Sequence, residues 1–402
     1  MTPAEAEGAV PPTAIVNIGT VVTGQLDRPT LEADTILLRE GRIAAVGTHD
    51  QVDVGEATVV VDAAGATLAP GLIDSHCHVV IGDYTPRQKT VDFLESYVHG
   101  GITRCISPSE VHAPGRPRDP AGVKALALAA QRCFRDFRPG GMTVHAGCLI
   151  LEPGLEEHDF AELAREGVWL AKAGFGAFAR PRDCAPLVRW AQRHGFVVMC
   201  HSGGASIPGS SPVTADDLLA MQPDVGGHVN GGPTAMADED VERVITESTM
   251  ALQVVQAGNL RSALHVVRRA AQTGNLHRLL IASDTPTGTG VMPLAVLKSA
   301  AELASLAPLA PAVALAAATG NVGRVYRMDA GIVAPGRPAD LVLLDAPLGG
   351  RGRDALDALG RGDIPAVAAV ITQGVLRVLV SRNTPPPVRS VRVIRGSAAA
   401  LA

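Results

Sequence analysis

The feature that most constrains the fold is an alternation of apolar runs and helical patterns that begins near residue 67. Eight apolar runs recur over roughly 220 residues, separated by polar loops and helix-like segments. The runs are TLAPGLID, GITRCIS, MTVHAGCLI, GVWLAKAGF, FVVMCHS, DVGGHVN, MALQVVQAG and LLIASDT. The helical patterns between them include DPAGVKALALAAQRCF, APLVRWAQRHG and SALHVVRRAAQTG. Strands that alternate with helices form parallel sheets, and eight such units in this length are typical of a (β/α)8 TIM barrel.

The two ends of the chain carry strand patterns of a different kind, rich in β-branched residues and broken by Gly and Asp turns. They are AIVNIGTVVTG, DTILLREGRIAAVG and ATVVVDAAG near the start, and ADLVLLD and AVAAVITQGVLRVLV near the end. Glu40 and Gly41 lie within DTILLREGRIAAVG, where they join two strand patterns and predict a β-hairpin. We therefore predict an α/β chain in which residues 67–325 form the barrel, and residues 1–66 and 326–402 together form a small β-sandwich domain.

Composition and charge exclude several classes of function. A content of 47% hydrophobic and 19% charged residues is typical of a packed globular protein. The net charge is -5 and the chain has no basic run, so its charge does not favour binding to nucleic acid or to an anionic membrane. The start, MTPAEAEGAV, has no export signal, and the most apolar tract, LAPLAPAVALAAATG, is shorter than a membrane span. Six cysteines without a CxxC pair read as reduced thiols, so we expect a cytoplasmic protein.

Six polar side chains stand at or near the ends of the apolar runs, where a barrel of this kind carries its functional groups. They are His76, His78, Lys172, His201, His228 and Asp284. On a strand, His76 and His78 would point to the same face and could hold one ion. Taken alone, this pair is also typical of a strand end whose histidines only form hydrogen bonds. Four histidines, a lysine and an aspartate stand at matching positions of separate runs, and the chain has only 12 histidines in all. This arrangement predicts a metal site instead.

These segments resemble the amidohydrolase superfamily. The resemblance runs from the first strand patterns through GLIDSHCH to the closing GIVAPGRPADLVLLD. Longer and less common strings are similar to those of one group in that superfamily, the enamidases. These strings are GDYTPRQKT, HGGITRCIS, PGRPRDPAGVKALAL, HSGGASIPGSSPVTADD, HVNGGPTA and SRNTPP.

The resemblance implies a binuclear metal centre. His76, His78 and Asp284 would bind one divalent ion, and His201 and His228 would bind the second. Zinc, iron and manganese all suit imidazole ligands, so the identity of the two ions stays open.

The resemblance also implies a carboxylate that bridges the two ions, supplied in this superfamily by a carbamylated lysine or by a glutamate. Lys172 is the candidate on the fourth run and would have to react with carbon dioxide to become such a ligand. This position departs from the glutamate that we expect of enamidases. Glu110, after the second run, is a distant alternative.

The implied reaction is metal-dependent hydrolysis of a C–N bond in a cyclic amide. An enamidase opens the lactam of 1,4,5,6-tetrahydro-6-oxonicotinate, a compound of nicotinate degradation, and the freed enamine then loses ammonia to give 2-formylglutarate. Asp284 would take a proton from the attacking water and pass it to the leaving nitrogen. The alternatives are another cyclic amide, as in hydantoinases or dihydropyrimidinases, deamination of a heterocycle, and a non-catalytic barrel homologue.

Three further residues are candidates for binding this small-molecule substrate. Tyr84 and Arg87 follow the first run, where a guanidinium suits a substrate carboxylate, although a solvated loop charge explains Arg87 as well. His145 ends the third run and either hydrogen-bonds the substrate or is a core histidine. By resemblance we expect a homo-oligomer, a tetramer.

Overall fold

The structure is a computed structural model that describes residues 10–79, 90–109, 111, 115–205, 210–231, 234–287, 289–307 and 309–395. Its contacts divide the chain into two compact units. One unit comprises Met1–Leu72, Ser96–Thr103 and Ala300–Ala402, and the other comprises Ile73–Glu95 and Arg104–Ser299.

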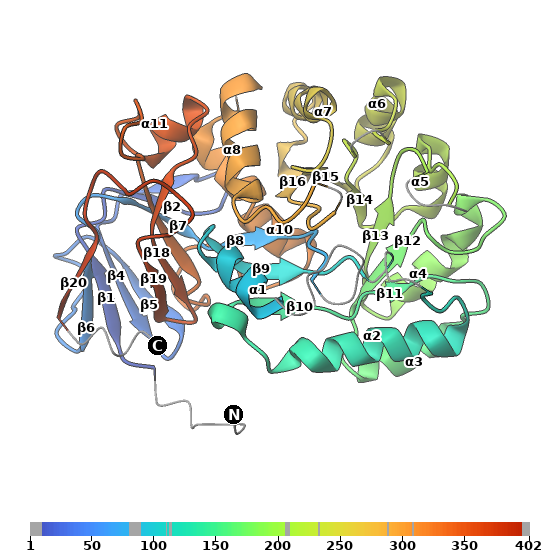
Figure 1. Cartoon of the computed structure of the whole chain (residues 1–402), viewed down its shortest axis with the longest axis horizontal. Coiled ribbons are helices and arrows are strands. Elements are labelled where there is room, and N and C mark those ends of the chain that lie inside the picture. Colours follow the sequence, from blue (N-terminus) through green and yellow to red (C-terminus); the bar gives the residue numbers. More distant parts are fainter. Residues whose placement is uncertain are drawn as a thin grey trace. The chain divides into compact units, whose positions relative to one another are not determined.

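The second unit is built on short strands that alternate with helices (Figure 1). The strands form two sheets, one in the order β10-β9-β8 and the other in the order β11-β12-β13-β14-β15-β16. The strands are β8 (Leu72–Asp74), β9 (Ile102–Ile106), β10 (Thr143–His145), β11 (Leu149–Ile150), β12 (Leu170–Ala173), β13 (Val197–His201), β14 (Val225–Gly227), β15 (Ala251–Val255) and β16 (Leu279–Ala282). The pairing of β9 with β10 and all pairings from β11 to β16 are parallel. The predicted α/β class with parallel sheets is confirmed.

Helices follow these strands, and from α2 to α7 each helix packs against the next. They are α1 (Thr90–Val98), α2 (Pro120–Arg135), α3 (Glu157–Arg165), α4 (Ala185–Arg193), α5 (Ala215–Met221), α6 (Asp238–Glu247) and α7 (Leu260–Gln272), with 3-10 turns at Pro139–Gly141, Pro181–Cys184 and Leu276–Arg278. Their starts have local causes: the Asp119 side chain accepts a hydrogen bond from the Gly122 amide at the start of α2. Asn259 accepts from the Ser262 amide in the same way at the start of α7.

The third apolar run is two strands rather than the single strand that we predicted. β10 belongs to the first sheet and β11 to the second. Gly147, between them, has a φ of 89°, a conformation that side-chain-bearing residues rarely adopt. A Cβ at this position would lie 2.5 Å from the Gln131 Cβ and 2.7 Å from the Ala127 carbonyl oxygen. The chain therefore bends here, and the ladder passes from one sheet to the other.

The outer strands of the two sheets also meet at one point. Cys77, after β8, and Thr285, after β16, form a parallel bridge, and the His78 amide donates to the Thr285 carbonyl at 2.9 Å. This pairing brings the end of the first predicted run beside the end of the eighth.

The first unit contains two further sheets, in the orders β20-β6-β1-β4-β5 and β19-β18-β17-β7-β2-β3. Their strands are β1 (Thr13–Val16), β2 (Thr20–Val22), β3 (Thr30–Leu31), β4 (Thr35–Arg39), β5 (Arg42–Gly47), β6 (Val59–Asp62), β7 (Thr67–Pro70), β17 (Leu341–Asp345), β18 (Ala366–Thr372), β19 (Val375–Leu379) and β20 (Arg392–Arg395). Leu38 and Val61 of one sheet share a buried core with Leu68 and Leu343 of the other. Strands from both ends of the chain therefore pack together.

The predicted hairpin at Glu40 and Gly41 is confirmed. Arg39 pairs with Arg42 across the turn, and both turn residues have positive φ values, 50° at Glu40 and 73° at Gly41. Positive φ at both central residues is the geometry that matches the twist of two antiparallel strands.

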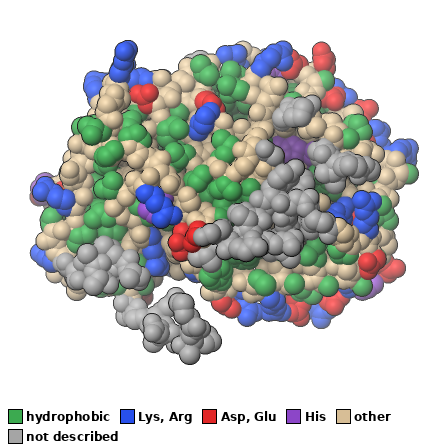
Figure 2. Space-filling model, viewed as in Figure 1, with side chains coloured by type: hydrophobic (Ala, Val, Ile, Leu, Met, Phe, Trp, Pro, Cys, Tyr) green, Lys and Arg blue, Asp and Glu red, His purple; other side chains and the backbone are tan. Residues whose placement is uncertain are grey.

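The remaining helices are α8 (Ala295–Leu306), α9 (Pro311–Ala317), α10 (Gly320–Val325) and α11 (Ala355–Gly360). Among the described residues, no helix combines the length and the apolar character needed to cross a membrane. On the face drawn in Figure 2, acidic and basic side chains of the described residues are interspersed rather than gathered by sign.

Candidate metal centre

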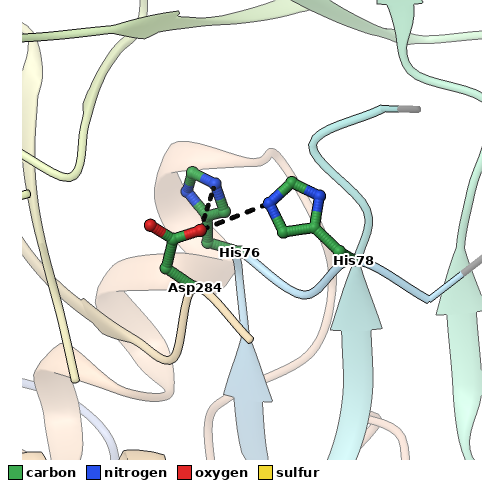
Figure 3. A group of neighbouring side chains, drawn as sticks. All are labelled: His76, His78 and Asp284. Carbon is green, nitrogen blue, oxygen red and sulfur yellow. Dashed lines mark hydrogen bonds and ion pairs between the residues drawn. The ribbon is translucent and has the colours of Figure 1, made fainter. Parts of the chain in front are cut away.

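His76, His78 and Asp284 converge in the second unit (Figure 3). The His76 Nε2 and the His78 Nε2 both face one carboxylate oxygen, Oδ1 of Asp284, at 3.3 and 3.2 Å. The strand ends are joined next to them, because the Asp284 amide donates to the His76 carbonyl at 2.8 Å. One potential ligand atom from each residue lies within 4.8 Å of the others.

The two histidines do not lie on a strand as we predicted. β8 ends at Asp74, so His76 and His78 stand on the irregular segment beyond it. Asp284 likewise lies two residues beyond β16, in a left-handed conformation with a φ of 54°. The backbone beyond the strands, rather than the pleat of a strand, aims these side chains at one point.

His201 and His228 form a second pair beside the first group. The His201 Nδ1 and the His228 Nε2 are 2.9 Å apart, and the His201 Nε2 donates to the Gly204 carbonyl at 2.9 Å. The ring centroids of His76 and His228 are 5.4 Å apart, so the two groups are neighbours. His201 ends β13, and His228 follows β14 with a φ of 41°.

Lys172 lies on β12 and is 1% exposed. Its Nζ is 3.3 Å from the Met199 sulfur and 5.7 Å from the centroid of the Phe175 ring. Burial lowers the pKa of the Lys172 amine, and its charge in turn lowers the pKa of three of the four histidines. The buried amine and the candidate ligands therefore influence one another electrostatically.

The protonation states suit metal binding. Burial lowers the pKa of His201 to about 4 and that of His228 to about 3, and holds the pKa of His76 well below its ordinary value. Burial acts to raise the pKa of Asp284, but the neighbouring histidines hold it well below its usual range. At neutral pH the three histidines are uncharged and Asp284 is a carboxylate, as metal ligands must be.

The contact between the His76 Nε2 and the Asp284 carboxylate joins two acceptors, and a cation between them would satisfy both. The His76 Nδ1 lies 2.7 Å from the side-chain oxygen of Gln253, which only accepts hydrogen bonds, so Nδ1 carries the proton of the neutral ring. The His76 Nε2 is then a lone pair facing the Asp284 oxygen, which is an acceptor too. Ligand atoms of one tetrahedral zinc ion lie roughly 3.3 Å apart at bond lengths near 2.0–2.2 Å, close to the spacing found here. The residues fit a divalent ion.

Asp74 and Gln253 form hydrogen bonds with the segments that carry the candidate ligands. The Asp74 carboxylate accepts from the amides of His76 and Ser283 at 3.2 and 3.0 Å, and so holds the backbone next to the ligands. Burial raises the pKa of Asp74 to about 6. Gln253 is not recognisable from the sequence alone, because a glutamine inside the run MALQVVQAG belongs to no motif. Its one signal was a polar residue in an otherwise apolar strand.

His145, the one remaining candidate that the structure describes, is not brought into this cluster. Tyr84, Arg87 and Glu110 lie outside the described residues. His145 ends β10, and its ring packs edge-on against Trp169 with centroids 5.4 Å apart. Burial lowers its pKa to about 3. Within the described part of the chain, no hydrogen bond or ring contact joins His145 to the candidate ligands.

His228→Ala is expected to remove the second ion while the chain stays folded. Loss of an outer partner of a ligand costs about 10–100-fold in metal affinity or activity, so loss of a ligand should lower activity about 100-fold. Elemental analysis, turnover and circular dichroism measure the three effects. His158→Ala, on an exposed histidine of α3, is the control. Full metal content in folded His228→Ala would remove His228 from the site.

Comparison with known proteins agrees with the resemblance to the amidohydrolase superfamily. No family model matches the sequence. The chain is 48% identical to the enamidase of Eubacterium barkeri over 384 residues, which are 95% of this chain and 99% of that protein. A crystal structure of enamidase at 1.9 Å resolution, described as a new member of the amidohydrolase superfamily, matches with a TM-score of 0.91 and 47% identity, and covers 95% of this chain and 100% of that one. Imidazolonepropionase of Mycolicibacterium smegmatis is 26% identical over 406 residues, covering 90% of this chain and 96% of that protein.

The fold, the ligand cluster and these similarities define an amidohydrolase, a class whose members are metal-dependent and typically binuclear. Identity of 48% over nearly the full length of both chains narrows the class further. This chain belongs to the enamidase family of the amidohydrolase superfamily.

Proposed function

We propose that this protein hydrolyses the C–N bond of a cyclic amide and that its substrate is 1,4,5,6-tetrahydro-6-oxonicotinate. The observation that carries the proposal is the 48% identity to an enamidase over 95% of the chain, with every candidate histidine ligand and Asp284 in place. Water adds to the lactam carbonyl, the C–N bond breaks, and a carboxylate and an enamine result. A second water then replaces the amino group, giving 2-formylglutarate and ammonia.

His76, His78 and Asp284 would hold one divalent ion, and His201 and His228 would hold a second. Bound there, such ions supply Lewis-acid activation of a water and of the amide carbonyl. Asp284 faces this position with an ionised carboxylate, so it can accept the proton of the attacking water. It then gives that proton to the leaving nitrogen, which could not depart as an anion. Zinc, iron and manganese all suit these ligands.

Lys172 is proposed to bridge the two ions as a carbamate. Its amine and carbon dioxide give a carbamate and one proton, which turns a cation into a carboxylate-like ligand. Its surroundings support this proposal, because the side chain is buried, and within the described part of the chain its amine contacts the Met199 sulfur and the Phe175 ring rather than an acid. A buried ammonium without an ion pair is costly, whereas a neutral amine is the form that captures carbon dioxide.

The finer features of the fold and setting are proposals as well. Residues 67–325 would form a closed (β/α)8 barrel, supported by the parallel sheets and by the bridge between Cys77 and Thr285. Residues 1–66 and 326–402 would form the sandwich, supported by their shared core. The protein would act in the cytoplasm as a homo-oligomer, a tetramer, in nicotinate degradation.

A panel of cyclic amides tests the proposed function. It contains the tetrahydro-oxonicotinate, the same ring without its carboxylate, a hydantoin and a dihydropyrimidine. Product mass and ammonia release are followed for each compound. We expect the highest kcat/KM on the carboxylated lactam, with one ammonia released per ring. Preference for the hydantoin or the dihydropyrimidine would replace this substrate with that ring.

Arg87→Ala is expected to raise KM for the carboxylated lactam while leaving KM for the uncharged ring nearly unchanged. Loss of one charge-assisted hydrogen bond costs about 1.5–3 kcal/mol, or roughly 10- to 150-fold in KM. Arg87→Lys separates charge from the fork of the guanidinium. Equal effects on both substrates would make Arg87 a residue that orders its segment and does not bind the carboxylate.

A further inference from the structure

Gln253 is completely buried in the middle of β15, and its side chain contacts two separate segments of the second unit. Its side-chain oxygen lies 2.7 Å from the His76 Nδ1 and 3.4 Å from the His228 amide nitrogen. Its side-chain nitrogen donates to the Ser75 hydroxyl at 2.8 Å and to the Ser75 carbonyl at 3.3 Å. One amide thus contacts a histidine from each of the two ligand groups.

The orientation of this amide is fixed by backbone groups whose roles cannot change. The Ser75 carbonyl can only accept, so it requires the Gln253 NH2 group on its side. The His228 amide can only donate, so it requires the Gln253 oxygen on the other side. A flipped amide would oppose donor to donor at the His228 amide and acceptor to acceptor at the Ser75 carbonyl. The atom facing the His76 Nδ1 is therefore an oxygen.

This orientation determines which nitrogen of His76 carries the proton. An oxygen acceptor at Nδ1 selects the Nδ1–H tautomer and leaves the Nε2 lone pair pointing toward Asp284. In water the choice between tautomers is open, but here the network makes it before any ion binds.

The same residue holds the backbone that carries His228. The Gln253 carbonyl accepts from the Val229 amide at 2.9 Å, while its side-chain oxygen faces the His228 amide. His228 has a φ of 41°, a conformation that a residue other than glycine keeps only when its surroundings hold it there. Two consecutive amides are thus held by one residue at the turn that aims His228.

We infer that Gln253 is a positioning residue that prepares both ligand groups for metal, by setting the tautomer of His76 and holding the backbone of His228. The inference rests on the proposed metal-dependent function only through metal binding. It requires neither a particular substrate nor the bridge at Lys172.

Two variants separate this role from packing. Gln253→Met keeps the length of the side chain and loses the acceptor and the donor. Gln253→Glu keeps the acceptor for His76 and His228, loses the donor to Ser75 and adds a negative charge. Gln256→Met is the matched control, because Gln256 lies just beyond β15 and its side-chain oxygen accepts from Ser299 at 2.8 Å, away from the ligands.

Two readouts are taken, and neither is activity. Nitrogen-15 spectra of the histidine rings in metal-free protein report the tautomer of His76, assigned by its loss in His76→Ala. Titration with Zn²⁺ gives the affinity. We expect Gln253→Met to lose the Nδ1–H tautomer and to bind Zn²⁺ about 10–100-fold more weakly. We expect Gln253→Glu and Gln256→Met to keep the tautomer and to bind within about threefold of the wild type or more tightly.

A folded Gln253→Met protein with the wild-type tautomer and affinity would overturn the inference. If Gln253→Met does not fold, the tautomer and the Zn²⁺ affinity of Gln253→Glu test the inference instead. A folded Gln253→Glu protein that loses either the tautomer or the affinity would show that the acceptor is not what positions the ligands. Failure of the proposed function looks different, because the substrate panel would then be inactive while both readouts behave as expected.

Discussion

Asp284→Asn is expected to lower kcat on the tetrahydro-oxonicotinate by about 10³–10⁴-fold. General acid–base catalysis contributes about 10²–10⁴-fold, and an amide can neither accept nor release the proton that the leaving nitrogen needs. The same substitution also weakens a ligand that contacts both His76 and His78. Turnover and metal content should therefore be measured on the same preparation.

The two roles of Asp284 can be separated by metal loading. Turnover at saturating metal should stay low, because added metal restores the ions but not the proton transfer. Asp238→Asn is a suitable control, since Asp238 begins α6 and pairs with Arg261 on the outside of the unit. Recovery of wild-type turnover at saturating metal would reduce Asp284 to a ligand alone.

Lys172→Ala is expected to lower activity by about 10³-fold and to bind fewer than two ions per chain. Removal of one preorganised electrostatic group typically costs about 10²–10³-fold, and here the bridge would be lost with it. Lys172→Glu is the sharper variant, because it supplies a permanent carboxylate at the same position. It should keep two ions and recover a large part of the activity without carbon dioxide.

The carbamate itself has a kinetic signature. Activity of metal-free wild-type protein should return faster when metal is added with bicarbonate than with metal alone. This bicarbonate effect should be absent in Lys172→Glu. A short carboxylic acid in the buffer should partly restore Lys172→Ala by filling the place of the bridge. Two ions and full activity in Lys172→Ala would place the bridge elsewhere.

The positions of the strands in the second unit were the part of this fold that the sequence predicted best. Apolar runs followed by helical patterns located every strand of the second unit, because burial on both faces requires near-continuous hydrophobic residues. The division of the first run into β7 and β8, which belong to different sheets, was missed. The split of the third run was missed as well, since the bend at Gly147 depends on contacts with Gln131 and Ala127 of α2. Those contacts are distant in the sequence, and a single glycine in an apolar run does not reveal them.

The candidate ligands were predicted from their positions, but their geometry was not. The period of a strand explained why His76 and His78 might share a face, yet both lie beyond β8, where bonds to Asp284 and Thr285 set their direction. Gln253 was missed because its role arises only when β15 is placed beside the segment after β8. Such partners are a property of the folded chain.

Stepwise reloading of chelated protein tests the central claim most directly. Metal is removed until less than about 0.1 ion per chain remains, and Zn²⁺, Mn²⁺ or Fe²⁺ is returned while hydrolysis of the tetrahydro-oxonicotinate is followed. The account predicts no hydrolysis in the metal-free protein and full activity at two ions per chain, with His228→Ala unable to reach it. Undiminished hydrolysis by the metal-free protein would contradict a metal-dependent cyclic amide hydrolase.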